Sequence, residues 1–362
     1  MKDSLSIVTN LLKSQKTLDS KIFSFFKQRH EGDILILDQG RSAMQAAIED
    51  FSLQGSEIIV PSFICSDVFT NLFIQNKITP KIVDCRPGSL HIHPDDVKKA
   101  ISSKTKAVII VHTYGIPNDP KPFRKLCNSK NLILIEDCAH AIDVNFKGKY
   151  LGSYGDAAIF SFVKEMPNYL GGAYVKNKGQ ISNYIKENLS RRKISMEDIL
   201  VLSNKFSISK LLKRVKSSIS NTAISNLYFR VNISLMSKLS KAIFCSKMNS
   251  LKIEQKRAIA IKLNKILPKG VSMITDQQIK SSSAKCFPFI VKNKSNIIKN
   301  LEQAGFNPGR GWIPSFSTNL LAKKHWNIPK SKVAESYEKD LINIDLDEIT
   351  DYNLHKIIKI VS

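Results

Sequence analysis

Between about residue 33 and residue 175, short apolar runs rich in β-branched residues alternate with segments of helical pattern. Several of these runs are apolar without alternation, as strands buried on both faces must be. Strands that alternate with helices are typical of a largely parallel sheet with crossover helices. This feature predicts an α/β fold. The predicted strands are "DILIL" from Asp33, "SEIIVPSF" from Ser56, "PKIVDC" from Pro80, "KAVIIVH" from Lys106, "NLILIED" from Asn131 and "AAIFSF" from Ala157.

The intervening segments carry helix signals. One is "SAMQAAIEDFSLQG", and another is "HPDDVKKAISSK", where Pro94 stands at a helix start with acidic residues in the first turn. After residue 178 the sequence becomes helical and lysine-rich, and from Pro268 a smaller α/β segment follows. We therefore place a large domain, with an N-terminal helical segment, at residues 1–245 and a small domain at residues 246–362.

Composition narrows the class of protein. The chain has 362 residues, 43% of them hydrophobic and 24% charged, which is ordinary for a globular protein that folds throughout. No apolar run approaches the roughly 18–20 residues of a membrane span, and the N-terminus lacks the apolar centre of a signal peptide. The six cysteines are scattered without metal-ligand spacing. We expect a cytoplasmic protein with reduced thiols and no integral membrane contact.

The formal net charge of +24 raises the question of nucleic acid. The lysines are spread along the whole chain, and no basic motif with interleaved aromatic residues accompanies them. We therefore expect no specific nucleic-acid partner and favour an enzyme that acts on anionic small molecules. Loose attraction to an acidic membrane surface remains an alternative for the charge.

The densest group of candidate site residues lies in residues 132–175. Asp137 ends a predicted strand, where ligands bind in an open α/β sheet. A buried aspartate opposite a pyridine nitrogen keeps that nitrogen protonated, and His140 could contact the phenolic oxygen of the same ring. Taken alone, Asp137 is better explained as the cap of the following turn, and His140 as a half-buried histidine with satisfied hydrogen bonds.

Lys164 directly follows the predicted strand "AAIFSFV". A lysine there usually belongs to a solvated loop. The functional alternative is an amine that forms an imine with an aldehyde cofactor. Its neighbourhood favours this alternative: Ser161 precedes it by three residues, and Gly171 and Gly172 follow it, which lets the backbone fold tightly beside a ligand.

A third candidate is the turn in "LDQGRSAMQAAIEDF", where Gly40, Arg41 and Ser42 stand between a strand and a helix. Free N–H groups at a helix start bind anions, and Ser42 adds a hydroxyl, so a phosphate fits there. An ordinary serine N-cap explains this segment about equally well.

Taken in order over most of residues 33–175, these segments resemble the DegT/DnrJ-type (StrS-like) family of sugar aminotransferases, which use pyridoxal 5'-phosphate (PLP). The resemblance is carried by "GRSAM", "GSEIIVPSFICSDV", the stretch from "ITPKIVDC" to "HTYGIPNDP", "IEDCAHA", "GSYGDAAIFSF" and the Lys-to-Gly-Gly spacing. It implies an aspartate-aminotransferase-like fold (PLP fold type I), with a mostly parallel seven-stranded sheet in the large domain and a smaller C-terminal α/β domain.

The resemblance also implies site residues. Lys164 would be the Schiff-base lysine, Asp137 would face the pyridine nitrogen, and His140 would lie beside the phenolic oxygen. The position that often stacks an aromatic ring on the cofactor falls on Cys65, with Phe63 near. The phosphate contacts that it implies come from Gly40, Arg41, Ser42 and Ser161, and from Asn226 and Arg230 across a subunit interface.

The activity implied by the resemblance is transfer of an amino group from glutamate to a keto-sugar nucleotide for surface polysaccharide or glycoconjugate synthesis, by a homodimer with sites at its interface. Two alternatives stand beside it. One is a PLP-dependent sugar dehydratase or deoxygenase, although known dehydratases of this type often replace the lysine with histidine. The other is a catalytically silent partner protein, which Cys65, and Leu170 in place of an acidic residue, leave open.

The segment "HIHPDD" contains two histidines and two aspartates that could ligate a metal ion. In the resemblance this segment falls on an exposed strand-to-helix turn. We therefore expect no metal site.

Overall fold

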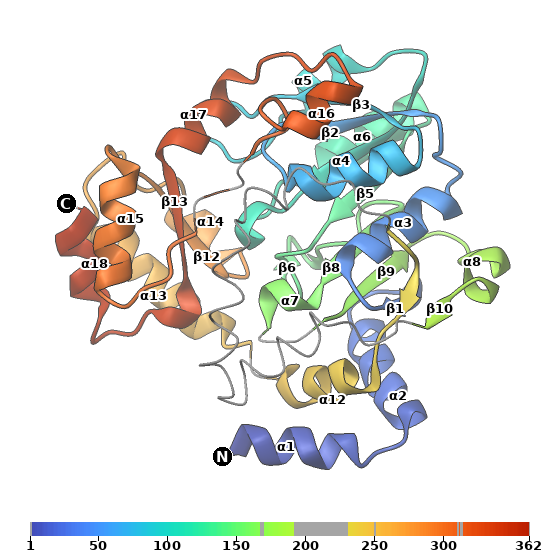
Figure 1. The fold of residues 1–362 in the computed structure, drawn as a ribbon, viewed down its shortest axis with the longest axis horizontal. Helices are drawn as coiled ribbons and strands as arrows, with labels where there is room; N and C mark the ends of the chain where they lie inside the picture. Colours follow the sequence, from blue (N-terminus) through green and yellow to red (C-terminus); the bar gives the residue numbers. More distant parts are fainter. Residues whose placement is uncertain are drawn as a thin grey trace.

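The structure, a computed structural model, describes residues 2–166, 170–191, 231–249, 251–309, 311 and 314–361. Its centre is a nine-stranded sheet with the strand order β10-β11-β1-β9-β8-β5-β4-β2-β3, packed between helices (Figure 1). The strands of this sheet are β1 (Asp33–Leu37), β2 (Glu57–Pro61), β3 (Thr79–Val83), β4 (Thr105–Val111), β5 (Ile133–Asp137), β8 (Ala157–Ser161), β9 (Gly172–Lys176), β10 (Ser190–Arg191) and β11 (Ser234–Leu235).

Strands β3, β2, β4, β5 and β8 are paired in parallel, whereas β9 pairs antiparallel with both β8 and β1. Among these seven strands only β9 runs against the others, so the prediction of a mostly parallel seven-stranded sheet is confirmed. The two-residue strands β10 and β11 extend the sheet beyond β1. The sequence does not predict β9, because its short run begins on a glycine that is typical of a turn.

The central strands are apolar on both faces because both faces are covered. In β4, Ile109 packs into one core cluster with residues of helices α3 and α4, while Ile110 packs into another with residues of α5 and α6. Both side chains are fully buried. This two-sided burial explains why the strand runs show no polar alternation.

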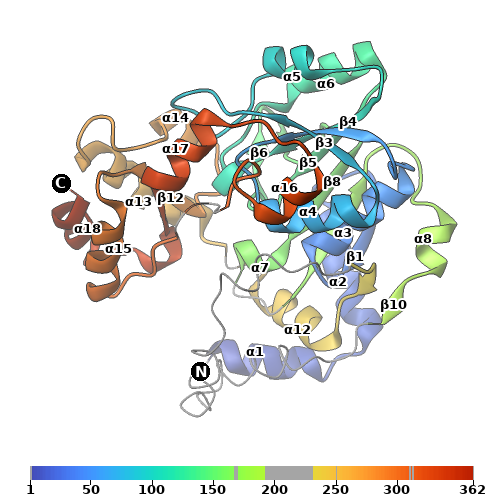
Figure 2. The ribbon, with the colours of Figure 1, turned by 45° about the horizontal axis from the view of Figure 1, so that its top comes forward.

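Helices α1, α2 and α12 pack together below the sheet (Figures 1 and 2). Phe26 of α2 and Phe244 of α12 both contact Phe162, the first residue of α7, and the Phe162 and Phe244 ring centroids lie 4.4 Å apart. The helices of this part of the chain are α1 (Lys2–Leu11), α2 (Gln15–Lys27), α3 (Gly40–Asp50), α4 (Ser66–Gln75), α5 (Pro94–Ala100), α6 (Pro120–Lys130), α7 (Phe162–Glu165), α8 (Asn183–Glu187) and α12 (Lys238–Lys247), with a 3-10 turn at Thr113–Gly115 and a hairpin of β6 (Asn145–Phe146) and β7 (Lys149–Tyr150).

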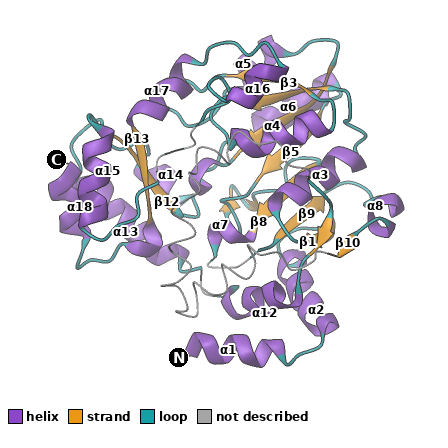
Figure 3. Ribbon diagram, viewed as in Figure 1, coloured by secondary structure: helices purple, strands orange, loops and turns teal. Residues whose placement is uncertain are grey.

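The C-terminal part is built around an antiparallel pair of strands, β12 and β13, with helices around it (Figure 3). Phe63 and Tyr114 of the large part join its core cluster. Conversely, Phe316 and Ala322 pack into the core beside α4. The boundary predicted after residue 245 stays a prediction. The elements of this part are α13 (Ile253–Ile266), α14 (Asp276–Lys280), β12 (Cys286–Ile290), α15 (Lys294–Gln303), α16 (Leu320–His325), α17 (Lys332–Asp340), β13 (Leu341–Asp345), a 3-10 turn (Leu346–Glu348) and α18 (Leu354–Val361).

Candidate functional site

A small pocket lies where β4, β5 and β8 end. These strands are parallel neighbours, so their carboxyl ends meet at one edge of the sheet, which is where open α/β sheets bind ligands. The pocket brings together an amine, a carboxyl and imidazoles from distant parts of the sequence. Its lining residues are Ile64, Cys65, Val111, His112, Asp137, Ala139, His140 and Lys164.

Lys164 lies on the short helix α7, directly after β8. The turn is fixed on one side by the Phe162 ring in the aromatic cluster described above, and by the Phe162 N–H, which donates to the Gly171 carbonyl at 2.9 Å. Gly172 closes the other side. A Cβ on Gly172 would lie 2.5 to 2.7 Å from the backbone of Gln39 and Gly40, so a side chain there would push the two turns apart. The sequence around Lys164 therefore places its turn against the start of α3.

Asp137 is the last residue of β5, and its Oδ1 accepts the Ala139 N–H at 3.0 Å. Burial raises the pKa of Asp137 to about 6, although the Ala139 N–H, His112 and Lys164 all favour its charged form. A carboxyl in this state gains from a cationic partner in the pocket. This is the electrostatic condition that a protonated ring nitrogen would meet.

His140 is buried in the turn after β5, where its ring stacks on Tyr114 with centroids 5.9 Å apart and planes 27° apart. Burial lowers the pKa of His140 to about 3, and Lys164 and Lys285 add to this effect. The imidazole is therefore neutral near pH 7. A neutral imidazole can hydrogen-bond a ligand oxygen without carrying a charge into the pocket.

The candidate phosphate residues gather at the start of α3. Gly40 is the first residue of that helix, and a Cβ on it would lie 3.0 Å from the Ser161 Cβ, so the structure brings these two distant residues together. Arg41 and Ser42 follow in the first turn. Ser42 is 3% exposed, and its hydroxyl donates to Asp38 Oδ1 at 2.6 Å. A phosphate contact from Ser42 would require that hydroxyl to turn away from Asp38.

Phe63 and Cys65 are separated by the fold. Phe63 is fully buried, packs edge-on against Tyr337 at 5.7 Å between ring centroids, and does not line the pocket. Cys65 does line it, at the start of α4, where burial raises the pKa of its thiol. Asn226 and Arg230 lie outside the described residues.

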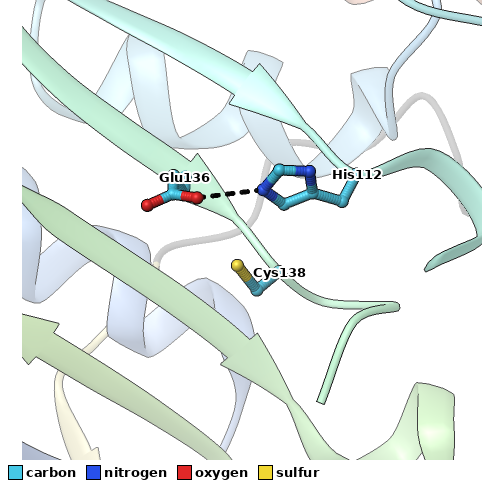
Figure 4. Close-up of side chains that lie close together, drawn as sticks. All are labelled: His112, Glu136 and Cys138. Carbon is cyan, nitrogen blue, oxygen red and sulfur yellow. Dashed lines mark hydrogen bonds and ion pairs between the residues drawn. The ribbon is translucent and has the colours of Figure 1, made fainter. Parts of the chain in front are cut away.

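No role for His112 or Glu136 was predicted from the sequence, although His112 lines the pocket and Glu136 directly precedes Asp137. His112 Nδ1 accepts the Asn118 N–H at 3.1 Å, which assigns the proton to Nε2, and Nε2 donates to Glu136 Oε2 at 3.1 Å (Figure 4). Both side chains are fully buried. The visible signal is a polar residue at the end of each apolar run, His112 after "KAVIIV" and Glu136 in "LIED".

Glu136 also holds the loop after the β6–β7 hairpin. Its two oxygens accept the N–H groups of Gly152 at 3.0 Å, Tyr154 at 2.7 Å and Gly155 at 2.6 Å. Cys138 lies close to this pair, and burial raises the pKa of its thiol well above the usual range (Figure 4). With its oxygens occupied by donors and the thiol protonated, the group His112, Glu136 and Cys138 is a structural network and not a built metal site.

The segment "HIHPDD" follows β3 and opens α5. His93 Nδ1 accepts the Asp95 N–H at 3.3 Å as the cap of that helix, and Asp96 binds Arg86 Nε at 2.7 Å. These contacts hold the turn before α5 and the start of that helix.

The model of the DegT/DnrJ/EryC1/StrS aminotransferase family matches residues 13–362. The chain is 35% identical over 162 residues to GDP-perosamine synthase of Vibrio cholerae. That alignment covers 44% of this chain and 43% of the relative, so the chain spans less than half the length of this curated relative in the match.

Solved structures match over almost the whole chain. S. venezuelae DesV, solved in complex with a ketimine intermediate, has a TM-score of 0.78 at 18% identity, covering 99% of this chain and 93% of that chain. E. coli GDP-4-keto-6-deoxy-D-mannose-3-dehydratase, solved with bound hydrated PLP, has a TM-score of 0.72 at 18% identity, covering 99% and 96%. The predicted aspartate-aminotransferase-like fold is thereby confirmed, and the chain belongs to the DegT/DnrJ/EryC1/StrS aminotransferase family.

Proposed function

We propose that this chain is a PLP-dependent aminotransferase that transfers an amino group, from glutamate, to a keto-sugar nucleotide. The observation that carries the proposal is the convergence of Lys164, Asp137 and His140 on one pocket at the carboxyl ends of the parallel strands. Family membership and the names of the relatives support the same class of reaction.

The residues present fit PLP. Lys164 offers an amine for an aldehyde, and Asp137 offers a buried carboxyl that gains from a cation. The N–H groups at the start of α3, with Ser161 beside them, offer an anion site. When bound, the pyridine ring of PLP withdraws electrons from the substrate carbon that loses a proton.

The side chains of the pocket divide the remaining work. Lys164 would hold the cofactor through its amine, and its Nζ could then move the proton at the substrate carbon. Asp137 would keep a proton on the ring nitrogen. His140, neutral near pH 7, would orient the ring by hydrogen-bonding an oxygen of it.

The test begins with the purified protein supplied with PLP. Borohydride should attach the cofactor to Lys164, located by mass spectrometry of the peptides, and glutamate should convert the bound cofactor to its amine form. A panel of keto-sugar nucleotides then identifies the acceptor. A protein that takes up no PLP would instead support the silent-partner alternative.

The dehydratase alternative shares the fold, as the match to the E. coli 3-dehydratase illustrates. Lys164 in the pocket favours transamination over it. The product distinguishes the two. An amino sugar that carries the nitrogen of glutamate supports transamination, whereas loss of a sugar hydroxyl without gain of nitrogen would favour the dehydratase.

We further infer that the enzyme is a cytoplasmic homodimer with sites at the subunit interface. Over the part of the chain that the structure describes, no helix has the length and apolar character needed to cross a bilayer. Light scattering on the purified protein measures the oligomeric state. Mixing Lys164→Ala subunits with Arg230→Ala subunits would test whether each site takes residues from both subunits.

A further inference from the structure

Glu165, directly after Lys164, is an acidic residue that the proposed chemistry does not use. Only 2% of it is exposed. Its Oε2 has no hydrogen-bond partner among the described residues, and its Oε1 lies 3.2 Å from Ser283 Oγ. A buried carboxylate with so few donors is costly unless it is protonated.

Ser283 belongs to the C-terminal part and is fully buried against the large part. Its N–H donates to the Gly115 carbonyl at 3.0 Å, and its Oγ lies 2.8 Å from the His140 carbonyl oxygen. The serine hydroxyl has one hydrogen, and a carbonyl oxygen can only accept. If that hydrogen goes to the nearer acceptor, His140 O, then the contact with Glu165 needs a hydrogen supplied by Glu165.

We propose that Glu165 is a positioning residue that carries a proton near neutral pH and donates it in a hydrogen bond to Ser283. The chain Glu165 O–H to Ser283 Oγ–H to His140 carbonyl then ties the turn of Lys164 and the turn of His140 to one serine of the C-terminal part. The position of the Lys164 amine thus depends on how Ser283 packs against the large part of the chain. This role deepens the proposed function and rests on it.

The charged groups that face Glu165 leave its carboxyl without a counter-ion. Lys285 is held by Asp345 at 2.6 Å and by Asp347 at 3.1 Å, and Lys256 Nζ lies 3.7 Å from Asp347. These lysines are compensated by aspartates of the C-terminal part, and no ion pair joins either of them to Glu165 among the described residues.

The remaining neighbours of Glu165 point the same way. The thiol of Cys286 is protonated, because burial raises its pKa to about 12. Burial also raises the pKa of Glu165 to about 8, against the opposing charges of Lys256 and Lys285. The neutral carboxyl is consistent with the hydrogen count at Ser283.

The first test needs no cofactor. The unfolded chain releases the Glu165 proton near pH 4.5, whereas the folded chain keeps it to about pH 8, so folding binds a proton in this window. The free energy of unfolding should therefore fall as pH rises from about 5 to about 8. Glu165→Gln keeps the donor and cannot ionise.

Measured against Glu165→Gln by urea titration of the apo proteins, the unfolding constant of the wild type should rise by up to about tenfold per pH unit in that window. Parallel pH profiles of the two proteins would overturn the proposal, because they would mean that Glu165 ionises at the same pH in the folded and unfolded chain.

The second test uses the loaded enzyme and the absorption of the cofactor bound at Lys164. Wild type and Glu165→Gln should titrate alike below pH 7, where both side chains are neutral. Above pH 8 the wild type gains a negative charge beside Lys164 and should keep the cofactor imine protonated to higher pH. Coinciding titrations over the whole range would contradict the proposal.

Ser283→Ala removes the link, and Ser282→Ala is its matched control. Ser282 is also buried, but its hydroxyl donates to Ile279 O and accepts the Ala284 N–H within the C-terminal part. Ser283→Ala should release PLP faster and shift its absorption, while Ser282→Ala should leave both unchanged; equal effects would overturn the link. If no PLP binds to any variant, the proposed function fails, and the apo pH profile still decides the state of Glu165.

Discussion

Asp137 and Lys164 line the same pocket from the ends of two neighbouring parallel strands, β5 and β8. The register pairs Asp137 with Ile159, so the carboxyl and the turn that bears the amine are both carried by the edge of the sheet. Because both strands are buried on either face, the core fixes where β5 ends and where the turn that bears Lys164 begins.

Replacing Lys164 by alanine should abolish turnover while leaving the fold intact. The amine both binds the cofactor and moves the proton, so the rate should fall by at least about 10³-fold. Borohydride labelling and a steady-state assay measure the two losses, with circular dichroism as the check on folding. The exposed strand lysine Lys81 gives a matched control as Lys81→Ala. Near-normal turnover in Lys164→Ala would remove this lysine from the mechanism.

PLP affinity should weaken as pH falls through about 6. Burial raises the pKa of Asp137 in the free protein to about 6, so below this pH the carboxyl is neutral and cannot pair with a protonated ring nitrogen. For each pH unit below about 6, the dissociation constant of PLP should rise by up to about tenfold more in the wild type than in Asp137→Asn. The comparison cancels the pH effects that the two proteins share. Identical pH dependence in the two proteins would place Asp137 away from the ring nitrogen.

Glu136→Ala should destabilise the fold strongly. The substitution removes the acceptor of three backbone N–H groups, those of Gly152, Tyr154 and Gly155, and of His112 Nε2. Each unsatisfied buried group costs about 1–3 kcal/mol, so the free energy of unfolding should fall by about 3 kcal/mol or more. Urea denaturation measures it, with the exposed Glu31→Ala as control. A loss no larger than that of the control would show that these bonds are not made.

Gly115→Ala tests the contact between Ser283 and the turn of His140. Gly115 has φ +77°, and a Cβ there would lie 1.8 Å from Ser283 Oγ and 2.4 Å from the His140 carbonyl oxygen. Gly55 has a similar φ of +71° with open space around it, so Gly55→Ala measures the backbone cost alone, about 1–2 kcal/mol. Gly115→Ala should be less stable than this control and should bind PLP more weakly. Equal stability of the two variants would mean that Ser283 does not pack there.

The strand positions could be predicted from the sequence because burial on both faces leaves an unbroken apolar run. "KAVIIVH" and "NLILIED" become β4 and β5, and their last polar residues lie at the sheet edge. The order of the segments around Lys164, Asp137 and His140 likewise pointed to one pocket, and the structure brings the three together. Their roles toward PLP stay predictions.

The direction in which each side chain of a turn points could not be predicted. Phe63 and Cys65 stand two residues apart in one loop, and both were candidates to contact the cofactor ring. The structure turns Phe63 into the C-terminal core and Cys65 into the pocket. The choice depends on the apolar side chains that the C-terminal part offers to Phe63, and these are distant in the chain.

The sequence by itself determined the α/β sheet, because periodicity and burial are local properties of each segment. It also determined which chemical groups follow the strands. Only the tertiary structure decided that Glu165 faces Ser283, 118 residues further along the chain. It also decided that the Glu136 carboxylate accepts backbone N–H groups, whereas its neighbour Asp137 lines a pocket. The physical reason is that hydrogen-bond partners and burial of a side chain are set by what packs against it, and that is fixed only when distant segments meet.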